Sequence, residues 1–180
     1  MATLRKNNVE KYLRSFAESV IKRGKKILNA KGKSGKLSDS LKYRLEATDK
    51  GYNLVFKGTD YAAFVDKGVS GTKKRRMFIN IDGRRKKSPF SYKTGVGNSP
   101  NIGALEKWIS RKGIKGRDEL GRFIKTKSLA MLFSKSIQRE GLKASSFFSK
   151  AVSENLVDFD INLLENFKTD IITHFETLDL

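Results

Sequence analysis

Three short segments of this chain combine apolar or aromatic residues with a closing glycine or turn, and they place the strongest constraint on its fold. They span residues 61–68, 105–114 and 139–151. Each has the composition of a packing element, in which apolar side chains pack on the rest of the protein and glycine permits a sharp change of direction. None contains a plausible catalytic group. The segments therefore favour a structural building block over an enzyme.

The length and composition of the chain favour a domain that folds without disulfides or metal. A chain of 180 residues can bury roughly 70% of the surface that its unfolded form exposes. There is no cysteine, which excludes disulfides, thiolate metal ligands and cysteine nucleophiles. No apolar run is long enough to cross a bilayer, and the first residues lack the apolar part of a signal peptide. We expect a soluble protein with no membrane partner, no cofactor and no small-molecule substrate.

The charge of the chain is strongly polarised along the sequence. Residues 151–180 hold seven acids and one base, a net charge of −6, within a total of +19. Residues 1–150 hold 37 bases and 12 acids, a net charge of +25. A basic body followed by an acidic segment allows opposite ends of identical subunits to attract one another. The basic body is also suited to a polyanion such as nucleic acid.

Apolar residues at helical spacing predict four helices, at residues 5–28, 101–112, 127–140 and 159–178. In the first helix Val9, Leu13 and Val20 fall on one side, while basic residues occupy other positions. Glycines 113 and 141 are expected to end the two middle helices. The connections expected between elements are a flexible break at 31–36, an exposed loop or small hairpin at 115–126 and an apolar plug at Phe147 and Phe148.

Alternating apolar and polar residues predict a β-hairpin over residues 39–58. Leu41, Tyr43, Leu45 and Ala47 alternate with polar residues, residues 49–51 supply a turn that ends in glycine, and Leu54 and Phe56 alternate on the return strand. A turn or short helix is expected at 61–66. These patterns predict that strands and helices share one small fold.

A long glycine-rich and basic segment, residues 69–100, carries the strongest chemical signal. Residues 77–81 are a strand candidate and Asp82-Gly83 indicates a tight turn, which predicts a second hairpin. Two clusters of four bases flank it, namely Lys73, Lys74, Arg75 and Arg76 before it and Arg84, Arg85, Lys86 and Lys87 after the turn. The hairpin would gather them into one patch. The patch is either a solvated loop or a contact with nucleic acid or an acidic neighbouring subunit, and charge leaves both interpretations open.

The remaining polar residues do not assemble into a catalytic pattern. His174 is the single histidine, without a second metal ligand or a nucleophile to activate. Residues 68–74 contain glycine and lysine but not the spacing of a phosphate-binding loop. Asp60 is better suited to cap a helix, and Asp158 and Asp160 to precede the last helix, than to act as an acid/base pair. No catalytic residue is therefore assigned.

All three segments resemble elements of a known family, and the middle one, residues 105–114 with the helix at 127–140, resembles its longer members. Residues 61–68, Tyr-Ala-Ala-Phe-Val-Asp-Lys-Gly, resemble the Y-x-x-F/Y-V-E-x-G element of the HK97-gp10-like tail-completion and head–tail joining proteins of tailed bacteriophages. Residues 147–151 occupy the place of the family's later P-F-x-x-A element, with Ser146 where a proline is usual. The resemblance follows the order of elements over residues 5–175, and the long insert at 70–100 departs from it.

The resemblance implies a structural virion protein in the neck or upper tail of a phage, synthesised in the host cytoplasm. It implies an α+β fold: a small curved, sandwich-like antiparallel sheet with a long N-terminal helix, two middle helices and a C-terminal amphipathic helix. It also implies a homo-oligomeric ring, commonly six- or twelve-fold, that contacts portal or adaptor and tail proteins. Packaged DNA is a further candidate partner. It implies no catalysis.

The sequence as a whole predicts one structural domain, with the N-terminal helix at 1–30, an α+β core at 31–151 that contains the basic loop 70–100, and an acidic helical segment at 152–180. Residues 39–58 and 76–93 are expected to build the sheet. The candidate packing or interface residues are Tyr61, Phe64, Trp108, Phe147, Phe148, Phe167, Ile171 and Phe175. The alternatives are a free basic nucleic-acid-binding protein and, last, a nuclease, which would need an acidic cluster for magnesium.

Overall fold

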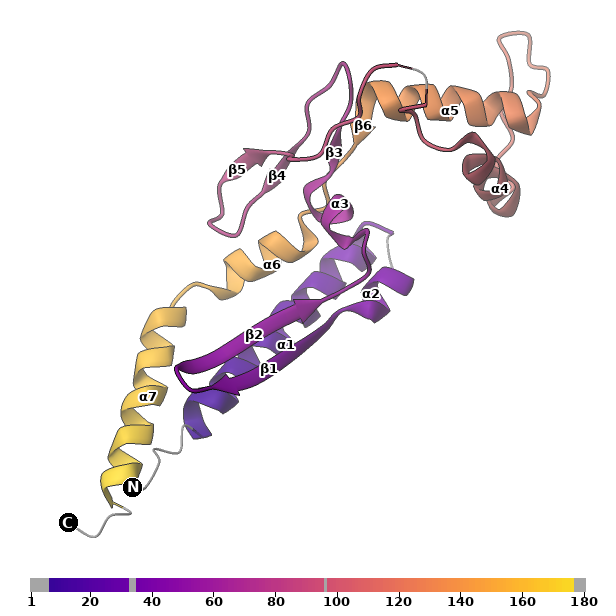
Figure 1. Cartoon of the computed structure of the whole chain (residues 1–180). Helices are drawn as coiled ribbons and strands as arrows, with labels where there is room; N and C mark the ends of the chain where they lie inside the picture. The colour runs from indigo at the N-terminus through magenta and orange to yellow at the C-terminus, as the bar shows by residue number, and fades with distance from the viewer. Residues whose placement is uncertain (1–6, 33–34, 96, 177–180) are drawn as a thin grey trace. The chain divides into compact units, whose positions relative to one another are not determined.

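The computed structural model describes residues 7–32, 35–95 and 97–176, and the chain divides into two compact units (Figure 1). Unit 1 comprises Met1–Ala62, Ile79–Arg84 and Ser145–Leu180, and unit 2 comprises Ala63–Phe78 and Arg85–Ala144. Helices alternate irregularly with short antiparallel strands, so the predicted α+β class is confirmed. The prediction of a single structural domain stays a prediction.

The longest described element of unit 1 is α1, Asn7–Ala30, which confirms the helix expected at 5–28 from residue 7 onward, while residues 5 and 6 of that prediction lie outside the described residues. Its buried residues recur at intervals of three or four, as an amphipathic helix requires, and they are Val9, Leu13, Ala17, Val20, Gly24 and Leu28. The bases Lys11, Lys22 and Lys26 lie on its exposed side. This helix is the element on which the rest of unit 1 packs.

The predicted hairpin is confirmed as β1, Lys42–Thr48, paired with β2, Gly51–Lys57. In its register Tyr43 lies opposite Phe56 and Leu45 opposite Leu54, which puts these side chains on one face of the ribbon. The Tyr43 hydroxyl donates to Glu18 Oε1 of α1 at 3.1 Å, so this face is directed to the helix. A short helix that the sequence did not predict, α2, Lys36–Ser40, follows the expected break at 31–36 and precedes β1, and its Leu37 is buried. Residues 33 and 34 of that break lie outside the described residues.

The second half of unit 1 comes from the C-terminal part of the chain. Helix α6, Phe147–Asn155, packs on α1, and Phe147 is almost fully buried. Phe148 contacts Phe56 of β2 edge to face, with ring centroids 5.2 Å apart. The expected apolar plug is therefore part of a helix that the sequence did not predict.

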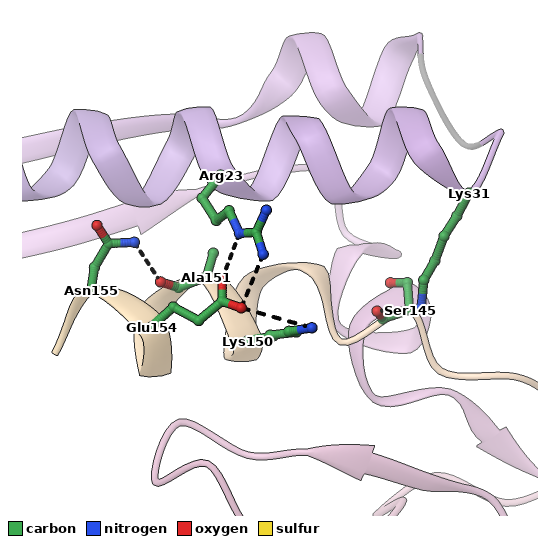
Figure 2. Close-up of polar contacts among 7 residues, drawn as sticks. All are labelled: Arg23, Lys31, Ser145, Lys150, Ala151, Glu154 and Asn155. Atoms are coloured by element: carbon green, nitrogen blue, oxygen red, sulfur yellow. Dashed lines mark hydrogen bonds and ion pairs between the residues drawn. The ribbon is translucent and has the colours of Figure 1, made fainter. Parts of the chain in front are cut away.

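Polar contacts join α6 and the segment before it to α1 (Figure 2). The Arg23 guanidinium donates to both carboxylate oxygens of Glu154, at 2.5 and 3.0 Å. The Lys31 ammonium donates to the carbonyl of Ser145 at 2.8 Å. The C-terminal half of α1 and the residue that follows it are thus linked to residues more than a hundred positions later in the chain.

The last helix, α7, Phe159–Glu176, confirms the predicted C-terminal helix over the residues that the structure describes, and the end of that prediction at 177–178 lies outside them. The Phe159 ring lies 5.6 Å from Tyr12 and 4.7 Å from Phe16, so α7 also packs on α1. Asp170, which is buried, accepts from the backbone N–H groups of Asn8 and Val9 at 2.9 and 3.0 Å. This aspartate caps the first turn of α1, whose N–H groups have no partner within the helix.

Unit 2 is built around two helices, α4, Ile102–Lys112, and α5, Thr126–Glu140, which confirm the two predicted middle helices. The Asn101 side chain caps α4 by accepting from Ala104 N at 2.9 Å, and Gly113 ends it in a left-handed conformation, as predicted. Their shared core consists of Ile109, Leu129 and Ala130, with Ile102, Leu105, Ile114, Ile124 and Phe133 packed around it. The segment between them forms the expected small hairpin, with a bridge between Arg117 and Phe123.

The remaining elements are short: α3, Ala62–Lys67; β3, Val69–Ser70; β4, Met77–Ile79; β5, Arg85–Lys87; and β6, Gly141–Leu142. In the part of the chain that the structure describes, the strands form three two-stranded sheets, β1–β2, β3–β6 and β4–β5. The hairpins at 39–58 and 76–93, expected to build one sheet together, belong to separate sheets. Three separate two-stranded ribbons do not make the curved, sandwich-like sheet that was expected.

Candidate interaction surfaces

Residues 68–71 cross residues 139–144 in unit 2, where β3 pairs with β6. Val69 lies opposite Leu142 and Ser70 opposite Gly141. Gly68 has φ +70°, and a Cβ added to it would lie 2.7 Å from Ala144 N and from the Leu142 carbonyl. A side chain at Gly71 would overlap the Arg139 carbonyl in the same way. Glycine is therefore required here because two backbones cross in contact.

The aromatic residues of segment 61–68 are partly exposed, Phe64 in unit 2 and Tyr61 in unit 1. Phe64 contacts the Phe90 ring, with centroids 4.4 Å apart, yet 45% of Phe64 stays exposed. Tyr61 is 44% exposed. An open depression of about 480 Å³ borders Phe64, lined by Val69, Pro89, Phe90, Ser91, Tyr92 and Leu142, and burial raises the pKa of Tyr92. The predicted packing residues Tyr61 and Phe64 therefore keep much of their surface available to a partner.

The two basic clusters flank one hairpin, as the sequence predicted. The N–H of Ser88 donates to the carbonyl of Arg76 at 2.9 Å and that of Asn80 to the carbonyl of Arg84 at 2.8 Å, which fixes the pairing of β4 with β5. Phe78, on β4, is buried, with the Lys67 ammonium 5.9 Å from its ring centroid. The exposed bases of the two clusters are Lys73, Lys74, Arg75, Arg84, Arg85, Lys86 and Lys87.

Arg76 differs from the other seven bases because it is half-buried. Its guanidinium donates to the Gly141 carbonyl at 3.4 Å, which connects the cluster to the β3–β6 crossing. Its Nε is a buried donor without a partner within the described residues. The Lys74 ammonium lies 4.0 Å from a Glu140 carboxylate oxygen. We therefore assign Arg76 mainly to the packing of unit 2 and define the other seven bases as the basic hairpin surface.

Helix α7 exposes a second candidate surface on unit 1. Ile161, Leu164, Ile172 and Phe175 are 60, 67, 47 and 57% exposed. Of the residues predicted on this helix, Phe167 is partly exposed and Ile171 is half-buried. His174 is half-buried, with its ring 6.4 Å from that of Phe175. A helix that packs on its own unit and also exposes large apolar side chains has the character of an interface element.

Helices α4 and α5 carry a third candidate surface, on unit 2. Trp108 contacts Phe133 edge to face at 6.1 Å and is 37% exposed. Met131 and Leu132 of α5 are also exposed. The Phe123 ring in the small hairpin before α5 lies under the Arg117 guanidinium, 4.2 Å from its centroid, and protrudes into solvent. Apolar side chains among bases are suited to a partner with apolar and acidic groups.

The sequence did not predict two polar contacts of the fold. Asp170 caps α1, and Arg23 pairs with Glu154, whose pKa the arginine lowers by hydrogen bonding to its carboxylate. Asp170 follows no local capping pattern, since it lies in the second half of a different helix. Glu154 is one acid among seven in its segment, and no short-range signal identifies its partner.

No group of three or more His, Cys, Asp or Glu side chains suited to a metal ion occurs within residues 7–32, 35–95 and 97–176. None of the helices in this part of the chain has the length and apolar character needed to cross a membrane. The chain matches no protein-family model, no curated protein and no solved structure.

Proposed function

We propose that this protein is a structural component of a tailed-phage virion, a ring-forming tail-completion or head–tail connector protein of the HK97-gp10-like type. In this role it joins the portal region to the tail, with itself, portal or adaptor proteins and tail proteins as partners. Its place is the phage neck or upper tail. The protein supplies surfaces in this role and carries out no catalysis.

The observation that carries this proposal is the close backbone contact of Gly68, the closing glycine of segment 61–68, with residues 142–144. The family resemblance rests in part on residues in segments 61–68 and 139–151, which are separated by 70 positions in the chain. In the fold Gly68 lies against residues 142–144, and β3 pairs with β6 next to it. The part of the second segment that takes part in this contact ends at Ala144, whereas its residues 147–151 lie in α6 of unit 1. The exposed apolar residues of α7 and α5 add surfaces that a subunit of an assembly needs.

The direct test is the mass and shape of the purified chain, alone and with the portal and tail proteins encoded beside it. Light scattering coupled to size exclusion gives the mass, and negative-stain electron microscopy gives the shape. The proposal predicts closed rings of constant subunit number, or incorporation into a portal-containing complex. A chain that stays monomeric at high concentration and with those components would refute it.

Binding to nucleic acid is the second candidate, favoured by the basic hairpin surface. Its exposed bases occur on both sides of one turn, where they can approach a phosphate backbone together. If they neutralise phosphates, the logarithm of affinity falls by about 0.9 per phosphate for each tenfold rise in salt.

A salt titration with double-stranded DNA tests this candidate. The double substitution Arg85→Ser and Lys87→Ser should reduce the slope by about 2, and Lys50→Ser in the β1–β2 turn serves as the control. Equal salt slopes for the wild type, the double variant and Lys50→Ser would assign the affinity to nonspecific charge rather than to this hairpin.

A further inference from the structure

We propose that the exposed stripe of α7 in one copy docks on the exposed face of α5 in a second copy, so that subunits associate head to tail. The α7 stripe consists of Ile161, Leu164, Ile172 and Phe175, and the α5 face consists of Met131, Leu132, Lys135 and Arg139. The inference rests on the proposed ring function, because it names the contact that would join neighbouring subunits. It goes further by assigning the partner of each surface.

The residues of the α7 stripe project from one side of the helix as two apolar pairs, with Lys168 between Leu164 and Ile172 on that side. Their intervals of three, eight and three positions correspond to whole turns of an α-helix, so the four side chains project from the same side. They remain exposed while Phe159 and Asp170 connect α7 to α1. The packing of α7 within unit 1 therefore does not use the stripe.

The charges beside the stripe disfavour pairing with a second α7. Asp160, Glu165 and Glu176 are exposed on this helix, and Lys168 is its one basic residue apart from the histidine. Two copies of the stripe in contact would bring these carboxylates close to one another. Like charges placed together across an interface oppose association. The partner of this stripe should be apolar and basic.

The α5 face has that chemistry. Met131 and Leu132 are 42 and 54% exposed, and Lys127, Lys135 and Arg139 lie exposed on the same helix. Positions 128, 132, 135 and 139 recur at helical spacing, which places Leu132, Lys135 and Arg139 along one side. Two helical surfaces can pack their apolar side chains together while acids at the rim of one meet bases at the rim of the other.

The two surfaces are different, which determines the symmetry of the association. A contact between α7 of one copy and α5 of another is heterologous, and it leaves a free α5 face and a free α7 stripe at the two ends of any pair. Such contacts continue until they close into a ring or extend into a filament. Nucleic acid is a poorer partner for the α5 face, since phosphates do not complement Met131 and Leu132.

Because the chain has no cysteine, introduced cysteines report the contact directly. Leu164→Cys and Leu132→Cys are prepared as separate proteins, mixed and oxidised mildly. The inference predicts a disulfide-linked dimer in the mixture and at least about tenfold less from either protein alone, since a disulfide needs Cα atoms within about 7 Å. Leu120→Cys mixed with Leu164→Cys is the control, because Leu120 is 75% exposed but lies outside the α5 face.

Three results would overturn the inference. Efficient cross-linking of Leu164→Cys with itself would show a symmetric α7 contact, and equal cross-linking with Leu120→Cys would show random collision. Cross-linking within one molecule of the Leu132→Cys, Leu164→Cys double variant, at a rate independent of concentration, would show docking in a single copy. If the wild-type protein forms rings despite any of these results, the α7–α5 contact is wrong but the proposed function still holds. If the wild-type protein never assembles, the proposed function itself is refuted.

Discussion

The Asp170 carboxylate caps α1, and its removal should strongly reduce the free energy of unfolding. The carboxylate is buried and accepts three hydrogen bonds, from Asn8 N, Asn8 Nδ2 and Val9 N at 2.9, 2.9 and 3.0 Å. Asp170→Ala removes a helix cap, which costs about 0.5–2 kcal/mol, and leaves the buried Val9 N–H without an acceptor, which costs about 1–3 kcal/mol. We expect a total loss of about 2–4 kcal/mol in the free energy of unfolding.

The assay combines thermal unfolding with hydrogen exchange. For a chain of this length the loss corresponds to a decrease in Tm of about 4–16 °C, followed by circular dichroism. Exchange at the Asn8 and Val9 amides should accelerate in the folded protein, because their acceptor is gone. Asp170→Asn keeps one acceptor oxygen and should lose about half as much.

Glu165→Ala is the matched control, since it removes the same charge from an exposed position of the same helix. It should change the free energy of unfolding by less than about 0.5 kcal/mol. Equal stabilities of Asp170→Ala and Glu165→Ala would refute the cap, and so would unchanged exchange at Val9. A drop in stability without faster exchange there would assign the effect to α7 alone.

Two further predictions concern the β3–β6 crossing and the contact between α1 and α6. Gly68→Ala should lower the free energy of unfolding in urea by about 2–4 kcal/mol, because strain at positive φ adds to overlap of the new Cβ with residues 142–144. The control Gly121→Ala has φ +78° and no atom near its Cβ, so it should lose only about 1–2 kcal/mol from strain alone. Arg23 lowers the pKa of Glu154 in the folded state. The pair therefore stabilises the folded protein at pH values above the pKa of Glu154 in the unfolded chain, about 4.3. This contribution is lost as the pH falls through the lower pKa of the folded state. The pair is partly exposed, so solvent screens its contribution. Arg23→Met should remove the corresponding slope from urea midpoints measured between about pH 5 and 3, and an unchanged slope would contradict the assignment.

Local patterns were sufficient to predict the elements whose residues interact with near neighbours in the sequence. The β1–β2 hairpin follows from the alternation of Tyr43 and Leu45 with polar residues and from a glycine at the end of the turn. Helix α4 follows from its apolar spacing, and its end follows from Gly113. The basic hairpin surface also follows from a local turn signal, at Asp82-Gly83, between two charge clusters.

Contacts between distant segments were not predictable in the same way. Each strand of the β3–β6 pair has two residues, too short for a recognisable alternation. Helix α6 begins after Ser146, which has φ +49°, a conformation that a serine does not signal. The inward orientation of Arg76 depends on the Gly141 carbonyl, which only the folded chain brings close. Tertiary packing determines these features.

The distribution of charge matters more to the proposed assembly than its total. Every subunit has a net charge of +19, so identical copies repel one another at long range. At physiological salt the screening length is about 8 Å, and the charges that decide association are therefore those within a few ångströms of the contact. An acidic α7 against a basic α5 face makes this short-range contribution attractive, and the four apolar residues of the stripe add a contribution that salt does not screen. Raising the salt concentration should consequently have two opposed effects on the ring, because it weakens the α7–α5 ion pairs while it reduces repulsion between the basic bodies.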